Sequence, residues 1–111
     1  MDDNAPNDGL TSRQRAAICS VLSHYPEVES ACLYGSRALG RHKPGSDIDL
    51  TLYGSIDLPK LNQISLELDD LLLPMIIDLS AFHHIENPEL RDHIRRVGKT
   101  IYTAATNRPK P

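Results

Sequence analysis

The stretch GSRALGRHKPGSDIDLTLY, residues 35–53, places a glycine–serine turn shortly before two aspartates. Its last seven residues, DIDLTLY (47–53), alternate between polar and apolar side chains. Such alternation predicts a β-strand with one face on the core and the other free for chemistry. Asp47 and Asp49 fall on the polar face, with Cα atoms about 6.5 Å apart. The apolar face consists of Ile48, Leu50 and Leu52.

Two carboxylates that point to one place repel each other, and a divalent cation removes the conflict. Hard oxygen ligands favour Mg²⁺, or Mn²⁺ in its place. Asp78, inside the apolar run MIIDLS (75–80), is a third carboxylate that could face the same site. Three such groups suit a two-metal arrangement for phosphoryl or nucleotidyl transfer. The plainer alternatives are a solvated strand face for Asp47 and Asp49 and a turn cap for Asp78.

The glycine–serine turn is the candidate phosphate-binding half of this site. Gly35 permits a tight backbone turn, Ser36 offers a hydroxyl, and the amides that follow can point at an anion. Arg37 is a further candidate phosphate contact. The nearby Arg41, His42 and Lys43 fit a solvated loop better than specific ligands.

A P-loop is the nearest alternative motif for this turn. Gly35 and Gly40 have the G-x-x-x-x-G spacing of that motif. The next two residues, Arg41 and His42, stand where a P-loop has its lysine and its serine or threonine. The side chains that grip phosphate and hold Mg²⁺ are therefore missing, which argues against a P-loop.

Helical periodicity and turn residues predict three helices and three strands around this stretch. The first two strands are joined by a loop and could be antiparallel, whereas a helix before the third strand suits a parallel crossover. The expected fold class is α/β (α+β), a small mixed sheet with helices packed on it. The expected elements, in chain order, are helix 12–24, strand 29–35, strand 47–53, helix 59–73, strand 75–80, helix 87–98 and a final extended segment 99–103.

Length and composition indicate one ordinary globular domain. The chain has 111 residues, 40% of them hydrophobic, and a net charge of −3, so no overall basic field indicates nucleic-acid binding. We expect a disordered N-terminus at 1–10, a folded domain at 11–103 and a disordered tail at 104–111.

Several features bear on the compartment of the protein. The sequence has no apolar run long enough for a membrane span, and its polar start does not resemble a signal peptide. We therefore expect a cytoplasmic protein without membrane partners. Cys19 and Cys32 lack metal-site spacing, and we interpret both as reduced core residues.

At this point the residues match a family. The stretch GSRALGRHKPGSDIDL resembles the signature of the DNA polymerase β-type nucleotidyltransferase superfamily, which pairs Gly–Ser with Asp-x-Asp and a later Asp. The ten residues between Ser36 and Asp47 are similar to the spacing in minimal nucleotidyltransferases. The resemblance covers roughly residues 12–102 and implies the polymerase β-type nucleotidyltransferase fold.

The resemblance also implies a Mg²⁺-dependent transfer of a nucleoside monophosphate, AMP from ATP, to an acceptor hydroxyl. Minimal members are commonly paired with a small helical protein of the HEPN class. In the antitoxin of such a toxin–antitoxin pair, the acceptor is a tyrosine of the partner. The alternative is a non-catalytic antitoxin or interaction module with the same fold, which neutralises its partner by contact.

The site residues carried over from the family are those of the opening stretch and the third aspartate. Gly35 and Ser36 would hold the phosphates of the nucleoside triphosphate. Asp47 and Asp49 would bind both metals and the triphosphate. Asp78 would bind the catalytic metal and help activate the acceptor.

Three further groups invite a functional interpretation but have plainer explanations. Adjacent histidines, His83 and His84, point opposite ways on a strand end and suggest a surface role. Arginines on the last helix predict a solvated face, with contact to RNA, substrate or a partner as the alternative; they are Arg91, Arg95 and Arg96. The apolar run 71–73 exceeds one helical stripe and could form part of a subunit interface.

Overall fold

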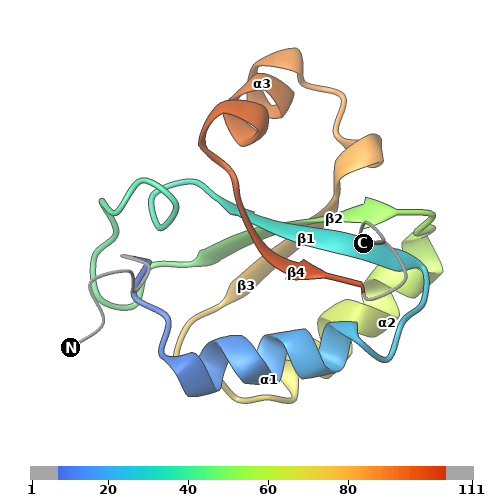
Figure 1. Cartoon of the computed structure of the whole chain (residues 1–111), viewed down its shortest axis with the longest axis horizontal. Helices are drawn as coiled ribbons and strands as arrows, with labels where there is room; N and C mark the ends of the chain where they lie inside the picture. Colours follow the sequence, from blue (N-terminus) through green and yellow to red (C-terminus); the bar gives the residue numbers. More distant parts are fainter. Residues whose placement is uncertain (1–7, 105–111) are drawn as a thin grey trace, which may run out of the picture.

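A computed structural model describes residues 8–104, which form a four-stranded mixed sheet in the order β3-β2-β1-β4. The strands β1 and β2 pair antiparallel, and β2 and β3 pair parallel across a helical crossover, as expected. Figure 1 shows α1 and α2 on one face of the sheet and α3 beyond the other. The elements are α1 (Ser12–Leu22), β1 (Val28–Tyr34), β2 (Ile48–Gly54), α2 (Leu58–Asp69), β3 (Ile77–Ala81), the 3₁₀ helix η1 (Phe82–His84), α3 (Pro88–Val97) and β4 (Lys99–Thr103).

Side-chain caps define the starts of the helices. Thr11 caps α1 in a reciprocal capping box with Gln14, and Asp57 caps α2 by accepting from the amide of Lys60. Asn87 caps α3 and accepts from two amides of its first turn. These bonds satisfy amides that have no partner within their own helix.

The helix expected over 59–73 is shorter in the structure, because α2 ends at Asp69. The amide of Leu71 donates to the carbonyl of Leu68, a tighter turn, and Leu72 then adopts a left-handed backbone with φ of 55°. The chain must reverse here to enter β3 parallel to β2. Leu72 ends up 87% exposed, and Leu71 and Leu73 pack partly against the core. Whether this run forms an interface stays a prediction.

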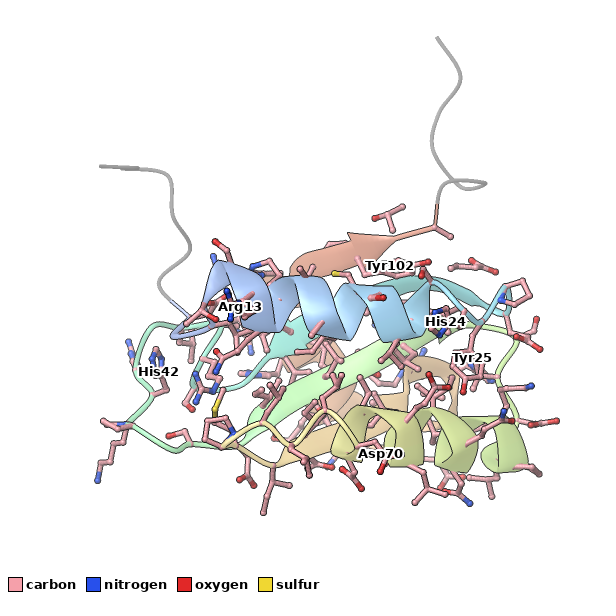
Figure 2. The ribbon with its side chains drawn as sticks, turned by 90° about the horizontal axis from the view of Figure 1, so that it is seen from below. Arg13, His24, Tyr25, His42, Asp70 and Tyr102 are labelled. Atoms are coloured by element: carbon pink, nitrogen blue, oxygen red, sulfur yellow. The ribbon has the colours of Figure 1, made fainter. Side chains whose placement is uncertain are left out.

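The main core lies between the sheet and the helices α1 and α2. Ile48, Leu50 and Leu52 are fully buried on the apolar face of β2, as the alternation predicted. Figure 2 shows these two helices side by side along one face of the sheet, with apolar side chains directed between them. The helix α1 contributes a buried stripe of Ile18, Val21 and Leu22.

A smaller apolar cluster fills the opposite face beneath α3. It is built from Cys32, Tyr34, Phe82 and Ile94. The ring of Tyr53 stacks on Phe82 with centroids 4.7 Å apart. This cluster fixes α3 over the polar face of β2.

The chain ends differ in part from the sequence-based expectation. Of the segment 1–10, expected to be disordered, residues 1–7 lie outside the described part of the chain. Asp8 is only 2% exposed, so this portion is folded against the domain. Ala104, assigned to the tail, is also buried and donates its amide to the carbonyl of Glu29. Residues 105–111 lie outside the described part. No helix within residues 8–104 is long and apolar enough to cross a membrane.

Candidate active site

Two of the predicted aspartates lie side by side on neighbouring strands. Asp49 of β2 is in register with Asp78 of β3, and on its other side with Tyr34 of β1. Residues in register across a sheet share a face, and neighbouring strands are about 4.8 Å apart. Asp47 lies just before β2, two residues from Asp49. The fold thus brings the three carboxylates to one end of the sheet.

The carboxylates at this end repel one another. Asp47 and Asp78 are exposed, whereas Asp49 is half-buried. Burial raises the pKa of Asp49 above its ordinary value, and the negative charges of Asp78 and Asp47 raise it further. His93 acts in the opposite direction. None of the ion pairs found within residues 8–104 involves these aspartates, so the site has an uncompensated negative charge.

The donor set fits a hard divalent cation, although the side chains are not arranged as a finished metal site. Carboxylate oxygens are what Mg²⁺ prefers, and the raised pKa of Asp49 marks a place where positive charge is favoured. Within the described chain, no three His, Cys, Asp or Glu side chains are grouped closely enough to hold a metal ion. The residues that would hold Mg²⁺ are therefore near one another through strand register rather than through side-chain contact.

The glycine–serine turn lies directly against this carboxylate cluster. Gly35 has φ of +75°, a left-handed conformation that favours glycine. A Cβ at this position would collide with the carboxylate of Asp49. The lack of a side chain at Gly35 therefore lets the turn and the aspartate lie together.

The turn continues as a single helix-like bend that leaves amides available. The amide of Leu39 donates to Gly35 and that of Arg41 donates to Ser36, over 3.2 and 2.9 Å. The amides that precede them in the bend find no acceptor within residues 8–104; they belong to Ser36, Arg37 and Ala38. Unpaired amides at such a bend are suited to an anion.

Arg37, the further candidate phosphate contact, has its guanidinium bonded to backbone carbonyls in this structure. Its side chain is buried, with Arg37 only 2% exposed. Its Nε and Nη2 both donate to the carbonyl of Ser46, at 3.1 and 2.8 Å, and its Nη1 donates to the carbonyl of Asp8 at 2.7 Å. These backbone acceptors come from distant parts of the loop and the N-terminus, and sequence patterns do not reveal them. Arg37 therefore organises the loop.

His93 of α3 is a site residue that the sequence reasoning missed. Its Nε2 accepts a hydrogen bond from the amide of Gly35 over 3.2 Å. Its ring meets that of Tyr34 edge-on, with centroids 6.2 Å apart. The helical spacing of Leu90, His93 and Val97 places His93 on the inward side of α3, and this pattern could have singled it out.

The remaining polar candidates do not join the cluster. Arg41 and Lys43 are exposed in the loop, consistent with the plainer interpretation. The exposed His83 and His84 meet edge-on within η1, and they belong to no metal-binding group of three in the described chain.

The arginines of α3 differ among themselves. Arg91 packs over the ring of Phe82 and donates to the carbonyls of Phe82 and Ile85, so it is structural. Arg95 also lies over Phe82, and Arg96 is exposed and pairs with Asp92. The solvated face predicted for this helix thus holds for Arg96 and fails for Arg91.

Comparison with known protein families identifies the family to which the fold belongs. Residues 16–107 match the family described as polymerase beta, nucleotidyltransferase. No curated protein sequence matches the chain.

Solved structures with the same fold include toxin–antitoxin complexes and a putative minimal nucleotidyltransferase. One is a toxin–antitoxin complex with AMP-PNP, with a TM-score of 0.68 and 20% identity over 84% of this chain and 76% of that one. Another contains a tri-AMPylated HEPN toxin of Shewanella oneidensis with its MNT antitoxin, at 0.64 and 16% over 88% and 76%. A putative minimal nucleotidyltransferase has a TM-score of 0.58 and 23% identity over 88% of this chain and 98% of its own.

Proposed function

This chain belongs to the polymerase beta nucleotidyltransferase family, and we propose that it transfers AMP from ATP to a hydroxyl group of a protein partner. The observation that carries this proposal is the contact between the two halves of the site. The glycine–serine turn over residues 35–40 is here called the phosphate turn. Its Gly35 lies against the carboxylate of Asp49, and Asp49 is in register with Asp78. Phosphate-binding and cation-binding groups therefore share one place.

Each residue of the site has a role in this proposal. Asp47 and Asp49 would hold Mg²⁺ together with the triphosphate, and Asp78 would hold the catalytic metal and help activate the acceptor. When bound, the cation neutralises charge on the phosphates and on the departing pyrophosphate. Ser36 and the unpaired amides of its turn donate hydrogen bonds to the phosphate oxygens.

The reaction forms one bond and breaks one. The acceptor oxygen forms a bond to the α-phosphorus, and the bond from that phosphorus to the bridging oxygen of the β-phosphate breaks. Pyrophosphate leaves with the bonding electrons, and the proton of the acceptor hydroxyl passes to Asp78 or to water. Catalysis on this scheme comes chiefly from positioning and charge stabilisation.

We propose a small helical protein of the HEPN class as the partner and one of its tyrosines as the acceptor. Support comes from the two antitoxin structures that share the fold, one of them with an AMPylated HEPN toxin. The small size of the domain also favours an acceptor supplied by another chain. The cytoplasmic location expected from the sequence belongs to this proposal, because the reaction consumes ATP.

Co-expression with the protein encoded next to this chain tests the proposal. We expect mass spectrometry to find AMP on a tyrosine of that partner with the wild-type chain. AMP should be absent when Asp47→Asn and Asp49→Asn are combined. Asp69→Asn, at an exposed position of α2 on the opposite face of the sheet from α3, should behave as wild type.

Either of two outcomes would count against this function. Equal modification by the double variant would exclude the catalytic role of the aspartates. An unmodified partner that is still fully neutralised by the double variant would favour the non-catalytic interaction module instead.

A further inference from the structure

We propose that Arg37 and the N-terminal residues 8–10, here called the N-terminal strap, form one positioning unit for the active site. This unit fixes the phosphate turn relative to the aspartates and thereby sets the affinity for the nucleotide. The affinity part rests on the proposed function. The structural part does not depend on it, since it concerns only how the loop over residues 36–46 is held.

Arg37 connects the two halves of the site across the loop that separates them. Arg37 directly follows Ser36 of the phosphate turn. The guanidinium of Arg37 donates two hydrogen bonds to the carbonyl of Ser46. Ser46 directly precedes Asp47. Two parallel N–H bonds to one carbonyl leave the loop little freedom to change the separation of its ends. A lysine could not reproduce them, because its ammonium group lacks the planar fork.

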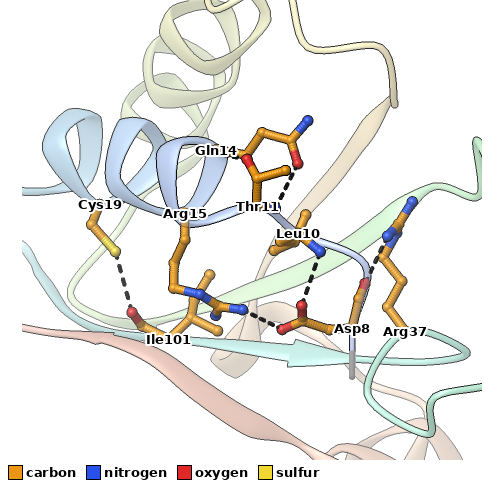
Figure 3. A network of polar contacts seen from close by, with 8 residues as sticks. All are labelled: Asp8, Leu10, Thr11, Gln14, Arg15, Cys19, Arg37 and Ile101. Atoms are coloured by element: carbon orange, nitrogen blue, oxygen red, sulfur yellow. Dashed lines mark hydrogen bonds and ion pairs between the residues drawn. The ribbon is translucent and has the colours of Figure 1, made fainter. Parts of the chain in front are cut away.

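The strap supplies the third acceptor of the guanidinium. The carbonyl of Asp8 accepts from Nη1 of Arg37, as Figure 3 shows. Gly9 passes so close that a Cβ there would lie 2.6 Å from this nitrogen. The strap therefore covers the guanidinium and holds it in the orientation that reaches Ser46.

The strap itself is anchored to the first helix. The carboxylate of Asp8 is buried and pairs with Arg15 of α1 over 2.6 Å, and it also accepts from the amide of Leu10 at 3.0 Å. A buried carboxylate is costly unless such partners satisfy it. Because Asp8 is satisfied in this one position, the strap has a defined place on the domain. The chain of contacts thus runs from α1 through Asp8 and Arg37 to Ser46.

The buried guanidinium has an electrostatic consequence as well. Its hydrogen-bond partners are neutral carbonyls, so its positive charge is not cancelled by a carboxylate bonded to it. The charge lies one residue from Ser36 in a poorly solvated place, where electrostatic interactions are stronger than in water. Arg37 can therefore favour an anion at the phosphate turn without touching it.

Amide hydrogen exchange in the absence of nucleotide tests the structural part. The amides to follow are those of Arg41 and Ser46, which donate within the loop to the carbonyls of Ser36 and Lys43. We expect Arg37→Lys and Asp8→Ala each to speed their exchange by about tenfold, a change of about 1.4 kcal/mol in local opening. The exposed Arg96→Lys is the matched control and should leave the loop unchanged.

Binding of AMP-PNP with Mg²⁺ tests the functional part. Arg37→Lys and Asp8→Ala should each raise the dissociation constant for AMP-PNP. The variant that combines them should raise it no further than Arg37→Lys alone, because the two residues act as one unit. Circular dichroism confirms that each variant is folded. Unchanged loop exchange, or additive losses in the double variant, would overturn the proposal. If wild type fails to bind AMP-PNP, the proposed function fails, whereas the exchange experiment still decides the positioning unit.

Discussion

Two carboxylates on opposite faces of the sheet, Glu67 of α2 and Asp49 of β2, have contrasting surroundings. Glu67 of α2 accepts hydrogen bonds from the hydroxyl of Tyr25 and lies 3.3 Å from the ring of His24. The Tyr25 bond and then the His24 bond lower the pKa of Glu67. Burial and two negative neighbours raise the pKa of Asp49. The hydrogen-bonded Glu67 stabilises the contact between α2 and the residues that follow α1, whereas the uncompensated Asp49 lies where a bound cation is favoured.

The largest effect on activity should come from a substitution that removes the uncompensated charge of Asp49. We expect Asp49→Asn to lower nucleotidyl transfer by about a hundredfold or more, since a charge-stabilising group is lost. The unfolding midpoint should not fall, because the substitution also removes repulsion between the aspartates. A variant that loses stability along with activity would show that Asp49 is mainly structural. Transfer rates and denaturant unfolding on the same preparation provide the comparison.

A second, smaller effect concerns the close approach of the phosphate turn to Asp49. Gly35 and Gly45 both have positive φ, but a Cβ at Gly45 would meet nothing within 4 Å. Alanine at either position costs about 1–2 kcal/mol of backbone strain. Gly35→Ala should lower the free energy of unfolding by more than Gly45→Ala does, because its methyl group displaces the Asp49 carboxylate. For the same reason, Gly35→Ala should also weaken nucleotide binding. Equal losses of stability and unchanged binding in the two variants would show that this contact is unimportant.

The smallest effect is the pH dependence of stability, which should have opposite signs for the two carboxylates. A raised pKa in the folded state means that the contribution of Asp49 is present in acid and is lost as pH rises through that pKa. The lowered pKa of Glu67 means that its contribution is present above its ordinary pKa and is lost as pH falls through the folded value.

The comparison is made with Asp49→Asn and Glu67→Gln. As the pH rises from about 3 to about 7, the free energy of unfolding of Asp49→Asn should increase relative to wild type, and that of Glu67→Gln should decrease. Urea unfolding across this range measures both differences. Parallel curves for the two variants would contradict the contrast between the sites.

Much of this arrangement could be predicted from sequence because local rules decide it. The alternation of residues 47–53 indicates which side of β2 is buried, and the bounds 87–98 expected for the last helix coincide with Asn87 and Gly98, the caps of α3. The end of α2 escaped prediction, because the reversal at Leu72 is imposed by the crossover rather than by helix propensity.

The missed site features involve residues far apart in the chain. His93 approaches Gly35 from 58 residues away, and Arg37 binds the carbonyl of Asp8, 29 residues away. Every residue type has a backbone carbonyl that can accept a hydrogen bond, so no sequence motif reveals which carbonyl Arg37 contacts. The sequence therefore indicates charged groups that the fold brings near one another, but not the contacts that hold them in place.

The response to Mg²⁺ with AMP-PNP tests the contrast between the two carboxylates most directly. The unfolding free energy of the wild-type chain should rise when both are added, by about 2.7 kcal/mol at a hundredfold excess over the dissociation constant. Glu67→Gln should show the same rise, and the combined Asp47→Asn and Asp49→Asn variant should show none. A rise that survives in the double aspartate variant, or no rise in wild type, would contradict the assignment of this end of the sheet as the nucleotide and metal site.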